Sequence, residues 1–389
     1  MSLKKNIKLL TWFNFFTDFR LYAPIAIIYF SRVSHSYALG AAVFSITYIV
    51  SAFLDIPTGI FADRIGRKRT VVIGALTAVL FAIFYAIGIN FWFLAIGAVF
   101  EGLSRAFYSG NNQALLHNIL SEEGLEEEYH IYSGKLSAMF QAALAISALV
   151  GAFIANWSFP LVMWLSVIPQ VLCFVISMQI TESKKSNEGH TDIFSELKEA
   201  ISLFVHNPKL RLLNVTSILS FGVGETAYQF QAAFYNLLLP IWAVGVTKAL
   251  SNVFAFIGYQ FSGKIISKYK ATNVLLFGEI YGRVVNFIAL LFPIPLSPFL
   301  MSTTSIFHGT GTTASGTLLQ REFTDKQRAT MSSLNSFGGS LFFGVFAYFT
   351  GLFADKIGPI KTLLIVQIIF LPTFWLFWKL YHLSKNDSN

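Results

Sequence analysis

The chain has 389 residues, of which 54% are hydrophobic and only 12% are charged, whereas soluble domains carry about 25% charged residues. This composition excludes an ordinary soluble protein and predicts an all-α membrane protein. A basic excess in such a protein is explained by Lys and Arg in cytoplasmic loops, so the net charge of +8 gives no reason to expect a nucleic-acid partner.

Apolar runs predict twelve membrane-spanning helices in two groups of six, because each run approaches the roughly 20 residues that cross a bilayer. The first group is expected at about residues 8–30, 37–61, 70–89, 92–116, 136–156 and 160–180. The second group is expected at about residues 212–239, 243–263, 272–292, 296–319, 329–353 and 359–380. The first run contains Asp18 and Arg20 and is interpreted as a retained helix rather than a signal peptide.

The longest polar break separates the two groups. We therefore expect an N-terminal six-helix bundle at residues 1–181, a cytoplasmic linker at 182–211 and a C-terminal six-helix bundle at 212–389. Apolar residues recur at helical spacing from Ile193 to Val205, which predicts an amphipathic helix within the linker. The break after the fourth span carries five Glu residues between 122 and 128 and is expected to be a solvated acidic turn.

The distribution of basic residues predicts the orientation of the chain. Of the 28 Lys and Arg, 21 fall in loops and termini on one side of the predicted membrane, 4 on the other side and 3 inside spans. Cytoplasmic loops carry the excess of Lys and Arg, so both termini are expected in the cytoplasm. The single cysteine, Cys173, lies in an apolar run, which excludes an internal disulfide.

The loop between the second and third spans carries a specific motif. Its glycines, acid and basic residues follow the pattern Gly-x-x-x-Asp-Arg-x-Gly-Arg-Lys, at Gly59, Asp63, Arg64, Gly66, Arg67 and Lys68. This pattern resembles the signature loop of the major facilitator superfamily. The resemblance implies two pseudo-symmetric six-helix bundles, transport by alternating access, no enzymatic activity and no cofactor, and it is strongest to bacterial drug and metabolite exporters of the plasma membrane.

The residue types in this loop fit a conformational latch. Gly59 is expected to let a neighbouring helix approach closely, Gly66 to permit a tight turn, and Asp63 to cap the positive end of a facing helix. The resemblance makes that partner the eleventh span, where small residues stand four apart. The alternative is that the basic residues only anchor the loop to lipid headgroups. The expected latch consists of Gly59, Asp63, Arg64, Gly66 and Arg67.

The signature loop is repeated near the C-terminus. Residues Thr350–Gly358 match Thr58–Gly66 at seven of nine positions. Transporter folds are often built from inverted repeats of helices, and spans two and eleven are equivalent in such units. The corresponding copy after span eight lacks the acid and retains Gly263, Lys264, Ser267, Lys268 and Lys270.

Ionisable residues within spans mark a pathway by default, because they are costly in lipid unless paired or hydrated. Glu101 with Arg105, and Glu279 with Arg283, stand four residues apart and could pair along one helix face. Such pairs can also be purely structural, and we expect this of Glu279–Arg283 in particular.

Asp18 and Glu225 lie near the middle of the first span of each half and have no opposite charge three or four residues away. Burial favours the neutral form of a carboxylic acid, so such a group can bind and release a proton as a site alternates between the two sides. The candidates for proton coupling are Asp18 or Glu225, with Glu101 third. A buried acid hydrogen-bonded to a hydroxyl is the alternative.

Polar and aromatic side chains predict a cavity for an amphipathic organic molecule. Spans one, four, seven and ten line the cavity in the superfamily, and Arg105 in span four suits either proton transfer or an anionic substrate group. The sequence contains no metal-binding motif. The expected cavity residues are Arg105, Asn14, Tyr22, Asn112, Gln229, Tyr235 and His308.

The function that fits these features is proton-coupled efflux of a small solute by a monomeric carrier in the lipid bilayer. Gly151 stands in span five without the proline and glycines of the antiporter signature, so direction stays open. A symporter or uniporter that imports a nutrient is the first alternative. A transport-inactive receptor or assembly protein on the same scaffold is the second.

Overall fold

Helices joined by short turns make up the computed structural model. It describes residues 3–109, 111–121, 124–125, 128–181, 202, 208–321, 325–371, 373–376 and 378–379, and the side chains of Asp63 and of residues 325–332 lie outside this description. No strand occurs in the described part of the chain. The expected all-α fold class is confirmed.

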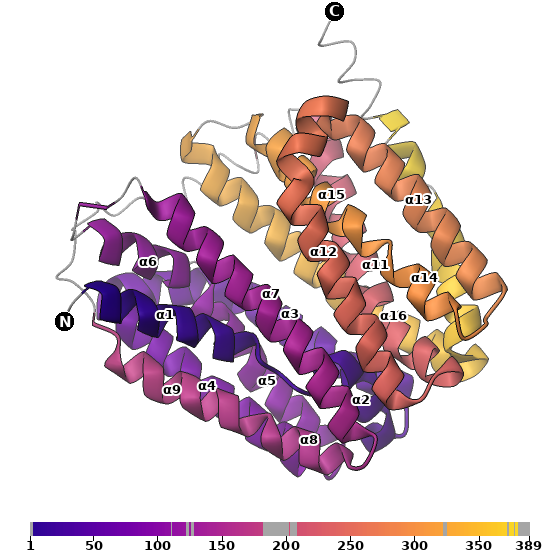
Figure 1. Ribbon diagram of the computed structural model, residues 1–389, viewed down its shortest axis with the longest axis horizontal. Helices are drawn as coiled ribbons and strands as arrows, with labels where there is room; N and C mark the ends of the chain where they lie inside the picture. The colour runs from indigo at the N-terminus through magenta and orange to yellow at the C-terminus, as the bar shows by residue number, and fades with distance from the viewer. Residues whose placement is uncertain are drawn as a thin grey trace, which may run out of the picture. The chain divides into compact units, whose positions relative to one another are not determined.

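The chain forms two compact units. The first consists of Met1–Asn187 with Pro240–Ala249, and the second consists of Glu188–Leu239 with Leu250–Asn389. Figure 1 shows their helices in colours that follow the chain.

Six spans precede residue 182, and three of them are interrupted. The first consists of α1 (Leu3–Asp18), η1 (Ala23–Ile25) and α2 (Ala26–Ser34). The second and third are α3 (Tyr37–Ile65) and α4 (Arg67–Ile87), and the fourth combines α5 (Phe91–Tyr108) with α6 (Asn111–Ser121). The fifth is α7 (Tyr129–Ala155), and the sixth combines α8 (Phe159–Leu165) with α9 (Val167–Gln179). The side chains of Ser36, Asn90 and Ser158 cap the helices that follow them.

Six further spans follow residue 207. They begin with α11 (Pro208–Leu238), α12 (Ile241–Tyr269) and α13 (Ala271–Leu291). The tenth combines α14 (Ser297–Ser302) with α15 (Ser305–Arg321). Helix α16 (Asp325–Ile369) contains the eleventh span and the start of the twelfth, which meet at a kink at Gly358 and Pro359.

The predicted segment boundaries need one correction. Helix α11 begins at Pro208, inside the range expected to be linker, because Pro is well tolerated in the first turn of a helix. The amphipathic helix expected at 193–205 falls almost entirely outside the described residues, and so does most of the acidic turn at 122–128.

Within the described residues, seven helical segments are long and apolar enough to cross a membrane by length and composition. One of them, Ser333–Leu376, covers both the eleventh and the twelfth expected spans. The other expected spans are divided into shorter helices or contain more polar residues. The interrupted spans include one, four and ten, three of the four spans expected to line a cavity.

Three equivalent turns share one backbone conformation. Gly66 (φ 97°, ψ 147°) joins α3 to α4, and Gly358 (φ 80°, ψ 161°) divides α16. Lys270 (φ 65°, ψ 146°) joins α12 to α13 in the same way. The conformation of Gly66 and Gly358 confirms that the repeated sequence makes a repeated turn. At Lys270 a side chain occupies a region that is essentially restricted to glycine.

We predict that Lys270→Gly stabilises the protein by about 1 kcal/mol. Relief of strain contributes about 1–3 kcal/mol, and the greater freedom of glycine in the unfolded chain removes about 0.5–1 kcal/mol of that gain. The measurement is the apparent melting temperature in detergent, which should rise. Lys270→Ala keeps the strained conformation and should leave it nearly unchanged, so an equal rise in both variants would exclude strain as the cause.

Candidate functional site

The first span is interrupted at the depth of its ionisable residues. Helix α1 ends at Asp18, and regular α-helix resumes only at Ala26. Pro24 explains the break, because proline has no N–H to donate and disfavours helical geometry in the residue before it. The break leaves backbone carbonyls at the end of α1 without the helical partners they would otherwise have.

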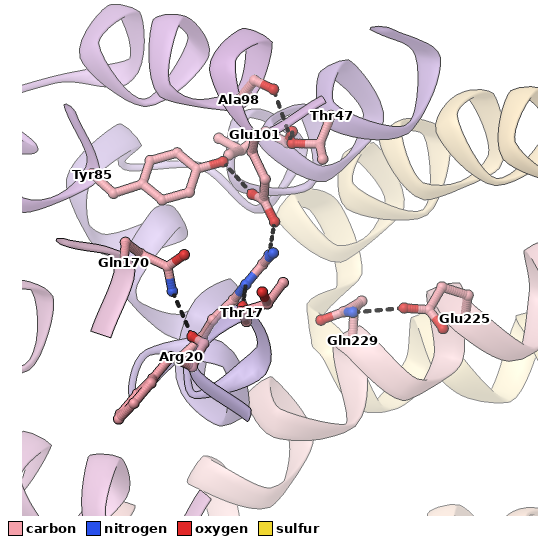
Figure 2. A network of polar contacts seen from close by, with 11 residues as sticks. Thr17, Arg20, Thr47, Tyr85, Ala98, Glu101, Gln170, Glu225 and Gln229 are labelled. Atoms are coloured by element: carbon pink, nitrogen blue, oxygen red, sulfur yellow. Dashed lines mark hydrogen bonds and ion pairs between the residues drawn. The ribbon is translucent and has the colours of Figure 1, made fainter. Parts of the chain in front are cut away.

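Two side chains satisfy carbonyls at this helix end. The Nε of Arg20 donates to the carbonyl of Thr17 at 3.1 Å, and Nε2 of Gln170 on α9 donates to the carbonyl of Phe16 at 3.3 Å. Both are drawn in Figure 2. A cationic group at the C-terminal end of a helix also interacts favourably with the helix dipole. The break is therefore stabilised by specific side chains.

Helix α7 lies directly against the interrupted segment. A Cβ atom at Gly151 would overlap the carbonyl oxygen of Leu21, so the two backbones touch at this point. Only glycine permits so close an approach. The structure thus gives Gly151, which the sequence only places in span five, a defined packing role.

An ion pair joins the first and fourth spans. The guanidinium of Arg20 donates from Nη1 to the Glu101 carboxylate, whose other oxygen accepts a hydrogen bond from the Tyr85 hydroxyl at 2.8 Å (Figure 2). Arg20 and Glu101 side chains are each 12% exposed. Glu101 thus pairs across helices, and the pairing with Arg105 considered from the spacing is not the one observed. Arg105 instead places its guanidinium 4.4 Å from the ring centroid of Tyr48.

Asp18 lies at the end of α1 beside this ion pair. No side-chain hydrogen bond or salt bridge of Asp18 with another described residue is observed. The positive charges of Arg20 and Arg105 both act on its carboxylate. Asp18 is therefore an acid of the first unit whose carboxylate interacts with positive charges without a direct ion pair to a described residue.

Two of the predicted cavity residues carry buried polar atoms. The Tyr22 hydroxyl is buried within electrostatic reach of Arg20 and Glu101. The Asn112 side-chain oxygen is also buried and lacks a described partner. The Tyr22 hydroxyl is therefore close enough to respond to a change in the charge of Arg20 or Glu101.

The candidate acid of the second unit is Glu225 on α11. It accepts a hydrogen bond from Nε2 of Gln229 at 2.8 Å (Figure 2). The negative charge of Glu225 also acts on His308 of α15, whose ring packs edge-on to Tyr259 at 6.4 Å between centroids. His308 is exposed. Glu225 and His308 are thus two titratable side chains of the second unit that lie close enough for their charges to interact.

The predicted pair on α13 has a structural setting. Nε of Arg283 donates to Glu279 at 2.7 Å, and Nη1 donates to Gln367 at 3.0 Å. Thr373 completes the network, since its hydroxyl donates to Glu279 at 3.1 Å. These contacts join α13 to the last span, which agrees with a structural role.

Other predicted residues are placed as follows. Asn14 donates to the carbonyl of Leu10 on its own helix, at 2.8 Å. Tyr22 and Tyr235 are 4% and 0% exposed, so they are packed side chains and do not line open space in this conformation.

Of the latch residues, Gly66 lies at a turn between α3 and α4, and the role of Gly59 stays a prediction. Within the first unit, a Cβ atom at Gly59 would meet nothing within 4 Å, and the expected partner helix belongs to the second unit. The Arg64 side chain is exposed and that of Arg67 is partly buried. The side chain of Asp63 lies outside the described set, and the latch stays a prediction.

The broken spans and the buried ion pair fit the family that the sequence indicates. The sequence profile of the Major Facilitator Superfamily matches residues 9–344. The chain belongs to the Major Facilitator Superfamily. It is therefore a membrane transporter of small molecules and not an enzyme.

Relatives with names include members of this superfamily. The chain is 20% identical over 388 residues to the uncharacterized MFS-type transporter YxaM of Bacillus subtilis, which covers 94% of this chain and 93% of the relative. It is 23% identical over 208 residues to the quinolone resistance protein NorA of Staphylococcus aureus, covering 51% of this chain and 52% of NorA.

Solved structures of the superfamily share the fold. The nucleoside transporter NupG superposes with a TM-score of 0.81 at 12% identity, over 98% of this chain and 99% of NupG. A bacterial homologue of the lysosomal transporter Spinster superposes with a TM-score of 0.76 at 16% identity, over 97% of this chain and 96% of the homologue. At these identities the likeness establishes the fold alone.

Three residues of the ion-pair network, Arg20, Tyr85 and Gln170, received no role from the sequence. Arg20 could have been found, because it is an intramembrane charge two residues from Asp18. Tyr85 and Gln170 lie in apolar runs, and nothing in the sequence marks them as functional. Their roles depend on contacts with residues 16 and 154 positions away in the sequence.

We predict that Arg20→Gln and Glu101→Gln each lower the free energy of unfolding by about 3–5 kcal/mol, because each leaves a buried charge without its partner. Replacing both residues by Leu should lower the free energy of unfolding by less than the sum of the two single changes. Tyr85→Phe, the control, removes one hydrogen bond to a charged group and should cost about 1.5–3 kcal/mol. Unfolding in detergent measures all four variants, and additive losses would show that the pair is not coupled.

We also predict that Gly151→Ala destabilises the protein by about 1–3 kcal/mol, because the added methyl group forces α7 away from Leu21. Gly134→Ala on the same helix is the matched control. Its Cβ atom would meet nothing within 4 Å, so it should gain up to about 1 kcal/mol from helix propensity. Opposite signs of the two melting-temperature shifts are expected, and equal shifts would contradict the role of Gly151.

Proposed function

We propose that this chain is a proton-coupled exporter that exchanges protons for a small amphipathic organic solute across a bacterial plasma membrane. The observation that carries the proposal is the state of Asp18. Its carboxylate lies at a break in the first span, lacks a described partner, and stands beside an arginine that is already paired with Glu101. A carboxylic acid in this setting can bind a proton and release it again.

Proton exchange at Asp18 would change the charge that surrounds Arg20. When Asp18 is neutral, Arg20 remains with Glu101 and with the end of α1. When Asp18 is charged, it competes for the same guanidinium, because opposite charges within a few ångström attract strongly in a medium of low dielectric constant. Since Arg20 also bonds a carbonyl of the broken helix, this competition couples protonation to the geometry of the first span.

The charged state of Asp18 also suits solute binding. A carboxylate attracts a solute that is cationic or that donates hydrogen bonds, whereas the neutral acid does not. Solute and proton then compete for one group, which is the requirement for antiport. Glu225, with Gln229 and His308, is proposed as the second proton-binding group, and Glu101 as a third that acts through Arg20.

The proposed direction of transport is taken from a relative. One relative is named for quinolone resistance, and export lowers the internal concentration of a drug. We further propose that the basic loops and both termini face the cytoplasm, that the chain acts as a monomer, and that Asp63 with the residues around it latches the outward-open state. Arg105 and Asn112 are proposed to contact the solute.

The test uses purified protein in liposomes that contain a pH-sensitive dye. We predict that a quinolone, the first solute to test, moves out of the cytoplasmic-side compartment as protons move in, and that Asp18→Asn lowers this exchange at least tenfold while the protein remains folded. Glu128→Gln, the control, removes a carboxylate from the loop before α7 and should retain activity.

The outcomes separate the candidate functions. Proton and solute movement in the same direction would replace the exporter by a symporter. Solute movement without any proton flux would indicate a uniporter. Full exchange in Asp18→Asn and in Glu225→Gln would remove the proposed coupling groups, and no movement of any solute in a broad screen would favour a transport-inactive receptor.

A further inference from the structure

A groove on the second unit lies between α12 and α15, which run side by side in Figure 1. Its volume is about 330 Å³, within the range of about 300–1,000 Å³ for small-ligand pockets. At its inner end the helices touch, since a Cβ atom at Gly258 would overlap the carbonyl oxygen of Ile306. The groove therefore has a closed end formed by backbone.

The walls and the open end of this groove differ in chemistry. The walls are apolar and partly exposed, with Ile257 at 37% and Phe261 at 47% exposure. The open end carries the exposed lysines Lys264 and Lys268, with Tyr269 beside them. No ion pair of either lysine with a described residue is observed. An apolar channel thus ends in two positive charges.

The lysines lie near the end of α12 that the predicted topology places on the cytoplasmic side. Lys268 is the last residue but one of α12, and Lys264 lies one turn before it, about 6 Å away along the helix axis. Such a spacing brings two ammonium groups to one phosphate. Basic pockets between spans on the cytoplasmic side are suited to anionic phospholipids.

A second groove repeats this arrangement in the first unit. It has a volume of about 560 Å³ and is lined by the basic residues Lys68 and Arg69 together with Val72, Ile73 and Met178. Lys68 and Arg69 come directly after the turn at Gly66, near the start of α4. Lys268 comes directly before the equivalent turn at Lys270. Two grooves of the same chemistry therefore flank equivalent turns, each within its own unit.

We propose that the groove between α12 and α15 binds an anionic phospholipid of the leaflet that contains Lys264 and Lys268. The phosphate lies between the two ammonium groups, and an acyl chain lies against Ile257, Phe261 and Ile306. The apolar walls favour a lipid over a soluble anion, which would leave them exposed. The groove of Lys68 and Arg69 binds a second anionic lipid in the same way.

The experiment is native mass spectrometry of the full chain in detergent, titrated with phosphatidylglycerol or with phosphatidylcholine. We expect the unmodified chain to retain phosphatidylglycerol in preference to phosphatidylcholine. The double variant Lys264→Gln/Lys268→Gln should bind one phosphatidylglycerol roughly thirtyfold more weakly, because each basic residue near an anionic headgroup contributes about 1 kcal/mol. Adding Lys68→Gln and Arg69→Gln should weaken the second lipid as well.

The matched control is Lys356→Gln/Lys361→Gln, which removes two exposed lysines that the predicted topology places on the opposite face of the membrane. It should retain both lipids. Equal loss in the control would show a general charge effect, and unchanged binding in Lys264→Gln/Lys268→Gln would exclude the groove. Displacement of the lipid by an excess of glycerol phosphate would show an anion site without lipid selectivity and would also overturn the proposal. Binding is read without transport, so the outcome is independent of solute export.

Discussion

A helix inside a bilayer has to satisfy its backbone hydrogen bonds within the protein, and the first span breaks this continuity at mid-depth. The carbonyls at the end of α1 then depend on side chains, and Arg20 and Gln170 supply two of the missing donors. Because Arg20 also neutralises Glu101, the charge network and the helix break form one arrangement. The position of Asp18, the close approach of α7 and the ion pair between spans one and four all follow from it.

The sequence predicted the features that depend on local chemistry. Hydropathy located the spans, because lipid selects for about 20 apolar residues whatever their neighbours are. The turn at Gly66 and its copy at Gly358 also depend on local chemistry, because a backbone position with positive φ favours glycine. The i,i+4 pair of Glu279 and Arg283 was also within reach, because helix geometry alone brings the two side chains together.

The features that depend on packing between helices were not predictable. The spacing of Glu101 and Arg105 allowed a pair that the structure does not form, because Arg20, 81 positions away, reaches Glu101 first. Gly151 departs from the antiporter motif of its span and yet makes a close backbone contact with Leu21. In both cases the deciding quantity is the distance to another helix, which one sequence does not contain.

The contact between Gly151 and Leu21 has a mechanical consequence. Two backbones meet there at a point that has no room for a side chain, so the two segments cannot move closer together. Gly151 thereby holds the interrupted segment of the first span close to α7, next to the helix end that carries Asp18.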